Sequence, residues 1–247
     1  MAKEESKWYA TGEEGVKRLA AEEAAAAKRR ESGASGRRWR LKKDTEGKFT
    51  IIDNPNFYFS EHNLKIGDRW GNYYTCLRGK DTCPLDELGN PSYVMVCTII
   101  DHRKWVDNKG VTHQNERKLL VTKGAAMKEL RRQMDKRGGD VRLCMFEAAR
   151  GDKPTECATG EHFTFVKKIT EELLLKVKPK NLDKAEAKNW LTPFDYRVLF
   201  APKTAAELRK LVGQAPPVGG DEDDAELPEL REVDADQAGP EDIEELI

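Results

Sequence analysis

The fold is decided by the stretch that begins Phe57-Tyr58-Phe59-Ser60-Glu61-His62-Asn63-Leu64-Lys65 and continues as Arg69-Trp70-Gly71-Asn72-Tyr73-Tyr74-Thr75-Cys76. Seven aromatic residues lie between Phe57 and Tyr93, a β-branched run follows at residues 93–100, and Trp105 closes the stretch. Aromatic and β-branched residues suit a half-buried pleated surface. The stretch therefore predicts strands of a β-sheet.

Basic residues are interleaved with these rings. A sheet that presents rings and cations on one face offers stacking to bases and charge to phosphates, without demanding a particular sequence. The pattern favours single-stranded nucleic acid as the ligand, while packing of each ring in the core remains the alternative. The candidate DNA-binding residues are Trp39, Phe59, Lys65, Arg69, Trp70, Tyr73, Tyr74, Arg78, Lys80, Arg103, Lys104, Trp105, Arg117 and Lys118.

Short motifs in the same stretch resemble a known family. They are Glu61-His62-Asn63-Leu64, Trp70-Gly71-Asn72, Thr75-Cys76-Leu77 and Cys83-Pro84-Leu85, and the similarity continues at Arg117-Lys118-Leu119, Lys136-Arg137-Gly138-Gly139 and Pro193-Phe194-Asp195-Tyr196. In this combination, over most of its length, the chain resembles the single-stranded DNA-binding proteins of tailed bacteriophages, which carry an oligonucleotide-binding (OB) barrel. The resemblance implies a role in phage DNA replication, recombination or repair, in the cytoplasm of the infected bacterial host.

One set of residues has the spacing of a metal site. His62, Cys76, Cys83 and Asp86 are spaced H-x13-C-x6-C-x2-D. Imidazole, thiolate and carboxylate are all zinc ligands, so the set predicts one structural Zn²⁺ that pins the loop between two strands. The related phage proteins often carry a third cysteine where this chain has Asp86. Buried free thiols are the alternative interpretation.

The cysteine count and the hydropathy define the broad class. Five cysteines at irregular spacing, in a chain of 247 residues, favour reduced thiols over a disulfide framework. The sequence has no apolar run of the roughly 18 residues that a membrane span requires, and its first residues do not resemble a secretory leader. We expect a soluble protein with no membrane partner.

Charge divides the chain into two unlike regions. Residues 221–247 contain 13 acidic residues and one basic residue, a sum of −12. Subtracting −12 from the net charge of −1 leaves +11 for residues 1–220. A basic body with an acidic tail is typical of nucleic-acid binders that carry their own polyanion. By resemblance to other single-stranded DNA-binding proteins, the tail is expected to contact phage or host replication and recombination proteins.

Composition predicts three parts. Residues 1–43 form a helix, at residues 12–30, and a basic arm that contacts phosphates or the next protein along a strand, unless it is only a solvated arm. Residues 44–213 form the core, and residues 214–247 form a linker and a disordered acidic tail. The predicted fold is mainly β (α+β): a five-stranded OB-like barrel with added helices.

Periodicity and turn signals place the elements of this core. Strands are predicted at 48–52, 56–60, 72–77, 92–101, 141–148 and 162–168, and a hairpin joins 93–106 to 111–121. Helices are predicted at 125–136, 171–178 and 203–212, with Met127, Leu130 and Met134 at core spacing. The segment 189–196 is expected to pack back on the barrel.

Enzymatic activity has little support. Neighbouring residues on a strand point to opposite faces, so Asp101-His102 and Glu61-His62 are not base-and-orienter pairs. The sequence contains no Walker loop, GxSxG or HExxH motif. We expect a protein that is not an enzyme. The alternatives are a zinc-containing regulator that binds duplex DNA and a metal-dependent nuclease that uses Asp101, Glu116 and Asp152.

Overall fold

The structure is a computed structural model that describes residues 34, 36–66, 69–79, 81–106, 110–153, 156–179, 182 and 184–213. The chain divides into two compact units, Met1–Arg37 and Arg38–Ile247, and the fold described below is that of the second. The predicted helix at residues 12–30 and the predicted tail at residues 214–247 lie outside the described residues.

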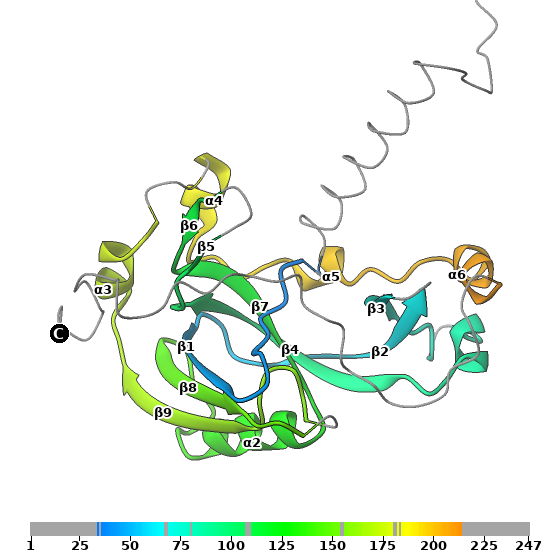
Figure 1. Ribbon diagram of the computed structural model, residues 1–247, viewed down its shortest axis with the longest axis horizontal. Coiled ribbons are helices and arrows are strands. Elements are labelled where there is room, and N and C mark those ends of the chain that lie inside the picture. The colour runs from blue at the N-terminus through cyan, green and yellow to red at the C-terminus, as the bar shows by residue number, and fades with distance from the viewer. Residues whose placement is uncertain are drawn as a thin grey trace, which may run out of the picture. The chain divides into compact units, whose positions relative to one another are not determined.

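The second unit is mostly β with a few helices (Figure 1). Its main sheet contains β1 (Thr45–Ile51), β2 (Phe57–Ile66), β3 (Arg69–Thr75), β4 (Ser92–Asp101), β7 (Glu116–Lys123), β8 (Cys144–Arg150) and β9 (His162–Lys168). A small ribbon is formed by β5 (Trp105–Val106) and β6 (Thr112–His113). The helices are α2 (Gly124–Asp135), α3 (Glu171–Lys176), α4 (Lys184–Asn189), α5 (Tyr196–Leu199) and α6 (Ala205–Val212), with a 3-10 turn, η1 (Pro84–Glu87).

The main sheet is organised around β4. One edge of β4 pairs with β7, as the predicted hairpin requires. The other edge pairs first with β2, through Ser92–Val96, and then with β1, through Ile99–Asp101. Because β7 pairs with residues 94–101 of β4 along one edge, β1 and β2 must follow one another along the other edge.

The sheet is open, and the prediction of a closed five-stranded barrel is not confirmed. The strand order is β3-β2-β4-β1-β8-β9, with β7 on β4, and no pairing between described residues joins β9 to β7. The physical reason that the sheet stays open lies in residues 38–41. Arg38 forms a parallel bridge with Leu119 of β7, Trp39 N donates to Leu119 O at 2.8 Å, and Leu41 N donates to Ala158 O at 2.7 Å. This segment, which composition assigned to the arm, occupies the edge of β7 that closure would need.

The curled part of the sheet encloses the main core. The odd-numbered residues of β4, Met95, Cys97 and Ile99, point into it and are at most 1% exposed. Phe49 of β1 meets Phe146 of β8 with ring centroids 6.0 Å apart. Helix α2 covers one end of this core through Ala126 and Leu130, and Met127 and Met134 pack against it, as their spacing predicts.

The outer face of β4 is covered by the segment that leads from α4 to α5. Trp190 Nε1 donates to Asn115 O at 2.9 Å, and Phe194 N donates to Thr98 Oγ1 at 3.0 Å. The Tyr196 hydroxyl donates to the Asp53 carboxylate at 2.8 Å. The prediction that residues 189–196 pack back on the sheet is confirmed, and β4 is buried on both faces.

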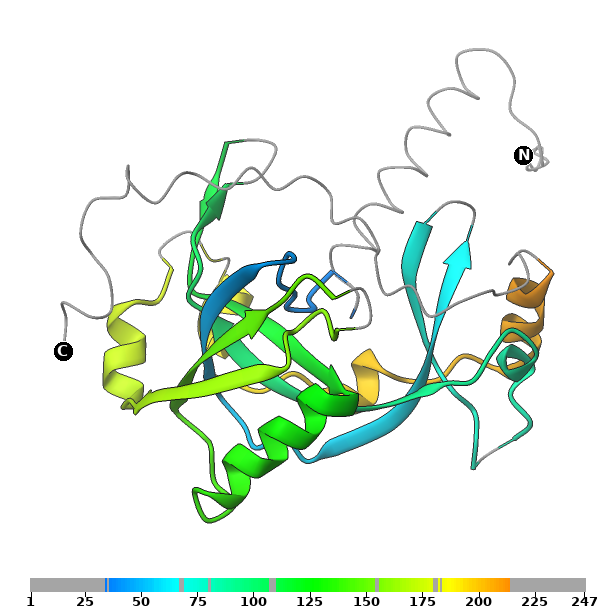
Figure 2. The same ribbon diagram turned by 60° about the horizontal axis from the view of Figure 1, so that its bottom comes forward.

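The β2–β3 hairpin extends away from the curled part of the sheet (Figure 2, cyan). Its base carries a second small core, formed by Leu64, Cys76, Leu77, Cys83, Leu85 and Leu208. We call this part, with η1 and α6, the hairpin lobe, and the part around Phe49 the body. The lobe contains the predicted metal ligands.

Candidate metal centre and nucleic-acid interface

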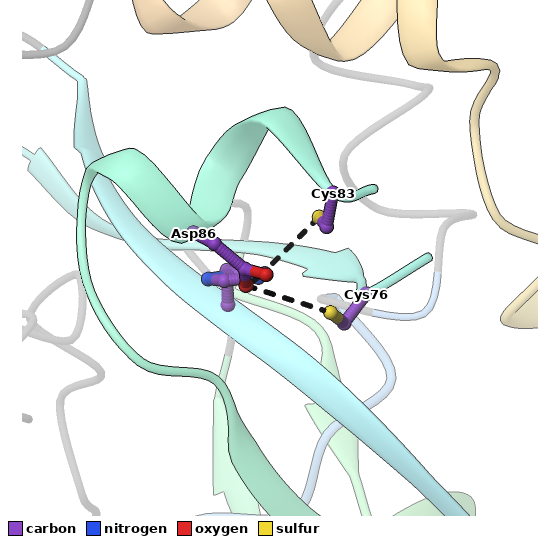
Figure 3. Close-up of side chains that lie close together, drawn as sticks. Cys76, Cys83 and Asp86 are labelled. Carbon is purple, nitrogen blue, oxygen red and sulfur yellow. Dashed lines mark hydrogen bonds and ion pairs between the residues drawn. The ribbon is translucent and has the colours of Figure 1, made fainter. Parts of the chain in front are cut away.

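The four predicted metal ligands converge in the hairpin lobe. His62 lies on β2 opposite Tyr74, Cys76 directly follows β3, and Cys83 and Asp86 belong to the η1 turn. The hairpin brings the first two together, and the loop that follows β3 brings back the other two. One ligand atom from each residue lies within 4.8 Å of those of the others. Figure 3 shows the side chains of Cys76, Cys83 and Asp86 pointing toward one another.

Two of three short distances in the cluster match those between the ligands of a tetrahedral ion, and the third is slightly longer. His62 Nε2 lies 3.3 Å from Asp86 Oδ1 and 3.6 Å from Cys83 Sγ, and Cys76 Sγ lies 3.9 Å from Asp86 Oδ1. Ligands of tetrahedral zinc, with bonds of about 2.0–2.3 Å, lie roughly 3.3–3.8 Å apart. The residues therefore fit zinc in both number and type. The second Asp86 oxygen accepts a hydrogen bond from Arg78 Nε at 3.2 Å, which orients the carboxylate as outer partners of metal ligands do.

Burial sets the protonation of the cluster. His62 is 3% exposed and Cys83 is 1% exposed. Burial lowers the pKa of His62, with Asp86 acting in the opposite direction, so the imidazole is neutral, as a ligand must be. Burial raises the pKa of the Cys76 thiol to about 11. A divalent ion would supply the positive charge that stabilises the thiolates.

Three rings predicted to stack on bases make packing contacts within the protein. Trp39 is 1% exposed and meets Phe49 edge-on, with centroids 5.0 Å apart, so its ring belongs to the body core and is closed to a base. Phe59 lies 4.6 Å from Phe200, in a cluster that covers the outer face of β2. Tyr74 packs against the core of the hairpin lobe.

Four of the eight predicted cations have partners within the protein. Arg103 Nε and Nη2 donate to the Asp101 carboxylate at 2.9 and 2.8 Å. Arg117 Nη1 donates to Thr192 O at 2.8 Å. Lys118 pairs with Glu116 at 2.7 Å. Together with Arg78 beside Asp86, these side chains stabilise the fold, and a phosphate would have to compete with their partners.

Tyr73 has a different environment. The guanidinium carbon of Arg38 lies 3.7 Å from its ring centroid and that of Arg40 lies 5.3 Å away. Arg38 is fixed by a bidentate pair with Glu61, of which the Nη1–Oε1 bond is 2.8 Å. A small recess with a cavity volume of about 40 Å³ opens here, with Arg40, Tyr73 and Lys123 among its lining residues. Rings and cations therefore meet where the hairpin joins the body.

A second ring lies on the β5–β6 ribbon. Trp105 stacks on His113 with centroids 4.2 Å apart and an interplanar angle of 11°. Lys118 Nζ lies 5.5 Å from the Trp105 ring. Lys104, next to Trp105, is exposed. His113 was missed by the sequence analysis, because only the pairing of β5 with β6 brings it to Trp105.

The remaining candidates are placed only in part. Lys65 is half-buried on β2. Arg69 and Trp70 lie on β3, but their side chains are outside the described set, and Lys80 is outside the described residues altogether.

Two further findings concern membrane-spanning helices and the comparison with known proteins. Within the described ranges, no helix is long and apolar enough to cross a membrane. The chain matches no protein-family model, no curated protein and no solved structure.

Proposed function

We propose that this protein binds single-stranded DNA with little sequence preference. The observation that carries the proposal is the recess at Tyr73, where Arg38 and Arg40 lie against the ring and Lys123 lines the wall. A ring bordered by cations supplies stacking to a base and charge to the flanking phosphates, and neither interaction reads a sequence. A single strand can expose both groups to the same recess, whereas a duplex keeps its bases stacked.

We further propose that the body is an OB-type barrel with the hairpin lobe inserted into it. Supporting this, β1, β4 and β7 are followed by α2 and then by β8 and β9, and β1 pairs with both β4 and β8. Three strands, a helix and two strands suit a five-stranded OB barrel. Residues 38–41 lie along the edge of β7 through the Arg38–Leu119 bridge, where a closed barrel would have its last strand.

The cluster at His62 fits one structural Zn²⁺, and we propose that this ion ties η1 to the hairpin. On the sequence resemblance alone, we propose a non-enzymatic role in phage DNA replication, recombination or repair, in the cytoplasm of the bacterial host. On the same ground, the acidic segment would contact partner proteins, and the basic N-terminal arm would support self-association along DNA.

Competition between DNA forms tests the proposal. A labelled oligonucleotide is bound to the full-length protein and displaced with unlabelled single strand or with duplex of the same sequence. We expect the single strand to displace it at far lower concentration, with no cleavage in Mg²⁺. Preferential displacement by duplex would favour the regulator, and cleavage would favour the nuclease.

The nuclease alternative has no assembled site among the described residues. Asp101 is 2% exposed and bound to Arg103, and Glu116 holds Lys118 and His113. In the part of the chain that the structure describes, the cluster at His62 is the group of three or more His, Cys, Asp or Glu side chains close enough to hold an ion.

Salt dependence tests the recess itself. Each phosphate neutralised on a single strand contributes about −0.7 to the slope of log K against log salt. Arg40→Gln should therefore weaken binding and make the slope shallower by about 0.7. Arg142→Gln removes the same charge from a side chain that pairs with Asp140 and lines a different surface, and it should leave the slope unchanged. Equal slopes for both variants would exclude Arg40 as a phosphate contact.

A further inference from the structure

Helix α6 depends on a docking surface. It has eight residues, and its N-terminus is a capping box in which Thr204 and Glu207 satisfy each other's backbone N–H groups. Isolated helices shorter than about 12–15 residues are marginal in water even with good caps. Leu208, at the centre of α6, is 0% exposed, and Ala205, Leu211 and Val212 are partly buried beside it. The helix is therefore stabilised by the packing of this apolar face against the rest of the protein.

The docking surface is the loop that carries the metal ligands. Leu208 packs in one cluster with Cys76, Cys83 and Leu85. Two of these three partners are predicted ligands, and Leu85 lies between the ligands Cys83 and Asp86 in η1. Helix α6 lies beside η1 in both views of the molecule (Figures 1 and 2).

Charged side chains also lie at the contact between α6 and the loop of η1. A pocket of about 330 Å³ is lined by Cys83, Asp86 and Glu87 of the loop and by Arg209 of α6. The basic side chain of the helix therefore borders the acidic side of the metal cluster, which favours docking in this orientation.

The turn itself is short, and its buried side chains Pro84 and Leu85 anchor it from one face. Turn η1 is a single turn of four residues, and its N-cap residue Cys83 makes no capping hydrogen bond through its side chain. Two local backbone hydrogen bonds hold the turn, from Asp86 N to Cys83 O and from Leu88 N to Leu85 O. A metal bound to His62, Cys76, Cys83 and Asp86 would be the strongest link between this turn and the hairpin, since each ligand bond fixes one of its elements.

We propose that metal binding at this cluster controls the docking of α6, and through it the anchoring of the acidic C-terminal segment. The described chain ends at residue 213, one residue after α6, and the charge of −12 lies between residues 221 and 247. With the metal bound, α6 is docked and the acidic segment starts from the hairpin lobe. Without it, η1 loosens, α6 loses the surface that Leu208 requires, and residues 201–213 undock. This proposal does not depend on nucleic-acid binding.

Limited proteolysis provides the test, because α6 contains or adjoins the trypsin sites Lys203, Arg209 and Lys210. The full-length protein is compared with and without Zn²⁺, with the products identified by mass spectrometry. Cleavage of a locally opened segment follows the population of the open form. We expect chelation to accelerate cleavage at Arg209 and Lys210 by at least about tenfold, while sites in the body change little.

Two variants separate docking from metal binding. Leu208→Ala removes the buried side chain of α6 and leaves all four ligands, so it should be cleaved rapidly in zinc while retaining about one zinc per chain. Leu175→Ala is the matched control, because Leu175 is 52% exposed on α3, and it should behave like the unchanged protein. Cys83→Ser should be cleaved rapidly with or without zinc.

Three results would overturn the proposal. The first is equal cleavage at Arg209 and Lys210 with and without zinc. The second is acceleration of every site in parallel, which would mean that the metal stabilises the whole protein. The third is protein that takes up no zinc when purified without chelator and incubated with the ion.

Discussion

The body and the hairpin lobe are stabilised by different means. The body core contains sixteen buried residues, including Trp39, Phe49, Phe146 and Phe163, whose rings contact one another. The core of the lobe contains six, of which two are cysteines. Small units bury too little apolar surface to offset chain entropy, and proteins commonly supplement such cores with metals or disulfides. The difference explains why the four potential ligands gather in the lobe.

The comparison also separates stability from proposed binding. Aromatic residues of the body face one another, whereas Tyr73 of the lobe faces Arg38 and Arg40 across the recess. A substitution in the body should therefore lower the free energy of unfolding. A substitution at the recess should weaken the binding of single-stranded DNA.

The largest effect is expected in the body. Phe49 is 0% exposed and contacts Trp39, Phe146 and Phe163. Phe49→Ala should lower the free energy of unfolding by about 3–5 kcal/mol, because it removes buried contacts and leaves a cavity. Urea unfolding followed by circular dichroism measures the change. Phe165→Ala, at a ring that is 37% exposed, should cost clearly less, and equal losses would contradict the assignment of Phe49 to the centre of the core.

Zinc should produce the next largest effect, and only through the lobe. At free Zn²⁺ 100 times its Kd, binding to the folded state adds about 2.7 kcal/mol of stability. Chelation should remove this increment, and Cys83→Ser should abolish the response to zinc. Calorimetry with and without added zinc measures it.

The matched control is a cysteine of the body. Cys97 is 0% exposed in the body core and does not belong to the ligand set. Cys97→Ser should lower stability on its own account but keep the zinc response. A lost response in Cys97→Ser, or a retained one in Cys83→Ser, would place the ion elsewhere.

A smaller effect, on binding, is expected at the recess. Tyr73→Ala should weaken single-strand binding by ~1–3 kcal/mol if the ring stacks on a base, with little change in the melting temperature. Phe59→Ala should do the reverse, since Phe59 packs on Phe200 at 4.6 Å. Fluorescence anisotropy and thermal melting, measured on both variants, check the pair. A fall in melting temperature for Tyr73→Ala without loss of affinity would make Tyr73 a core residue.

The smallest effect is expected from pH. His102 Nδ1 donates to Asn115 Oδ1 at 2.8 Å, and its Nε2 lies 2.7 Å from the Thr50 hydroxyl, which can donate to it when the ring is neutral. Burial lowers the pKa of His102 below its ordinary value of 6.5, with Asn115 and Asp101 acting in the opposite direction. The contribution of His102 to the free energy of unfolding should be complete above pH 6.5. It should decrease as the pH drops below 6.5, because the histidine of the unfolded chain then binds a proton before that of the folded protein does.

Unfolding measured between pH 7 and pH 5 in saturating zinc tests this prediction, since the metal removes His62 from the titration. His102→Gln should be less stable at pH 7 and should show a shallower dependence on pH. An unchanged pH dependence in His102→Gln would exclude His102 as its source.

Local pattern was enough to place most elements. Strand β4 was predicted at residues 92–101 and β9 at residues 162–168, and the structure has Ser92–Asp101 and His162–Lys168. Helix α2 was predicted at residues 125–136 and spans Gly124–Asp135. Alternation, helical spacing and the glycines after the helix are local signals, and they were read correctly because each element satisfies its own backbone hydrogen bonds or those of a close neighbour.

The cluster of four potential ligands was also accessible from the sequence, because residue type limits which side chains can bind zinc and a hairpin brings nearby segments together. The role of each ring was not accessible. Trp39 and Tyr73 are both aromatic residues beside arginines, yet one is 1% exposed in the body core and the other borders the recess. Only the pairing of residues 38–41 with β7 separates the two environments.

The sequence by itself therefore determined the elements, the charge division and the ligand set, since these depend on residue type and short spacing. The tertiary structure alone decided that the sheet stays open, that Trp39 lies in the body core, and that α6 packs on the loop of η1. Each of these contacts joins segments far apart in the chain, such as Leu85 and Leu208. No local pattern encodes such a pairing, because it is selected by how well the two surfaces fit when the whole chain has folded.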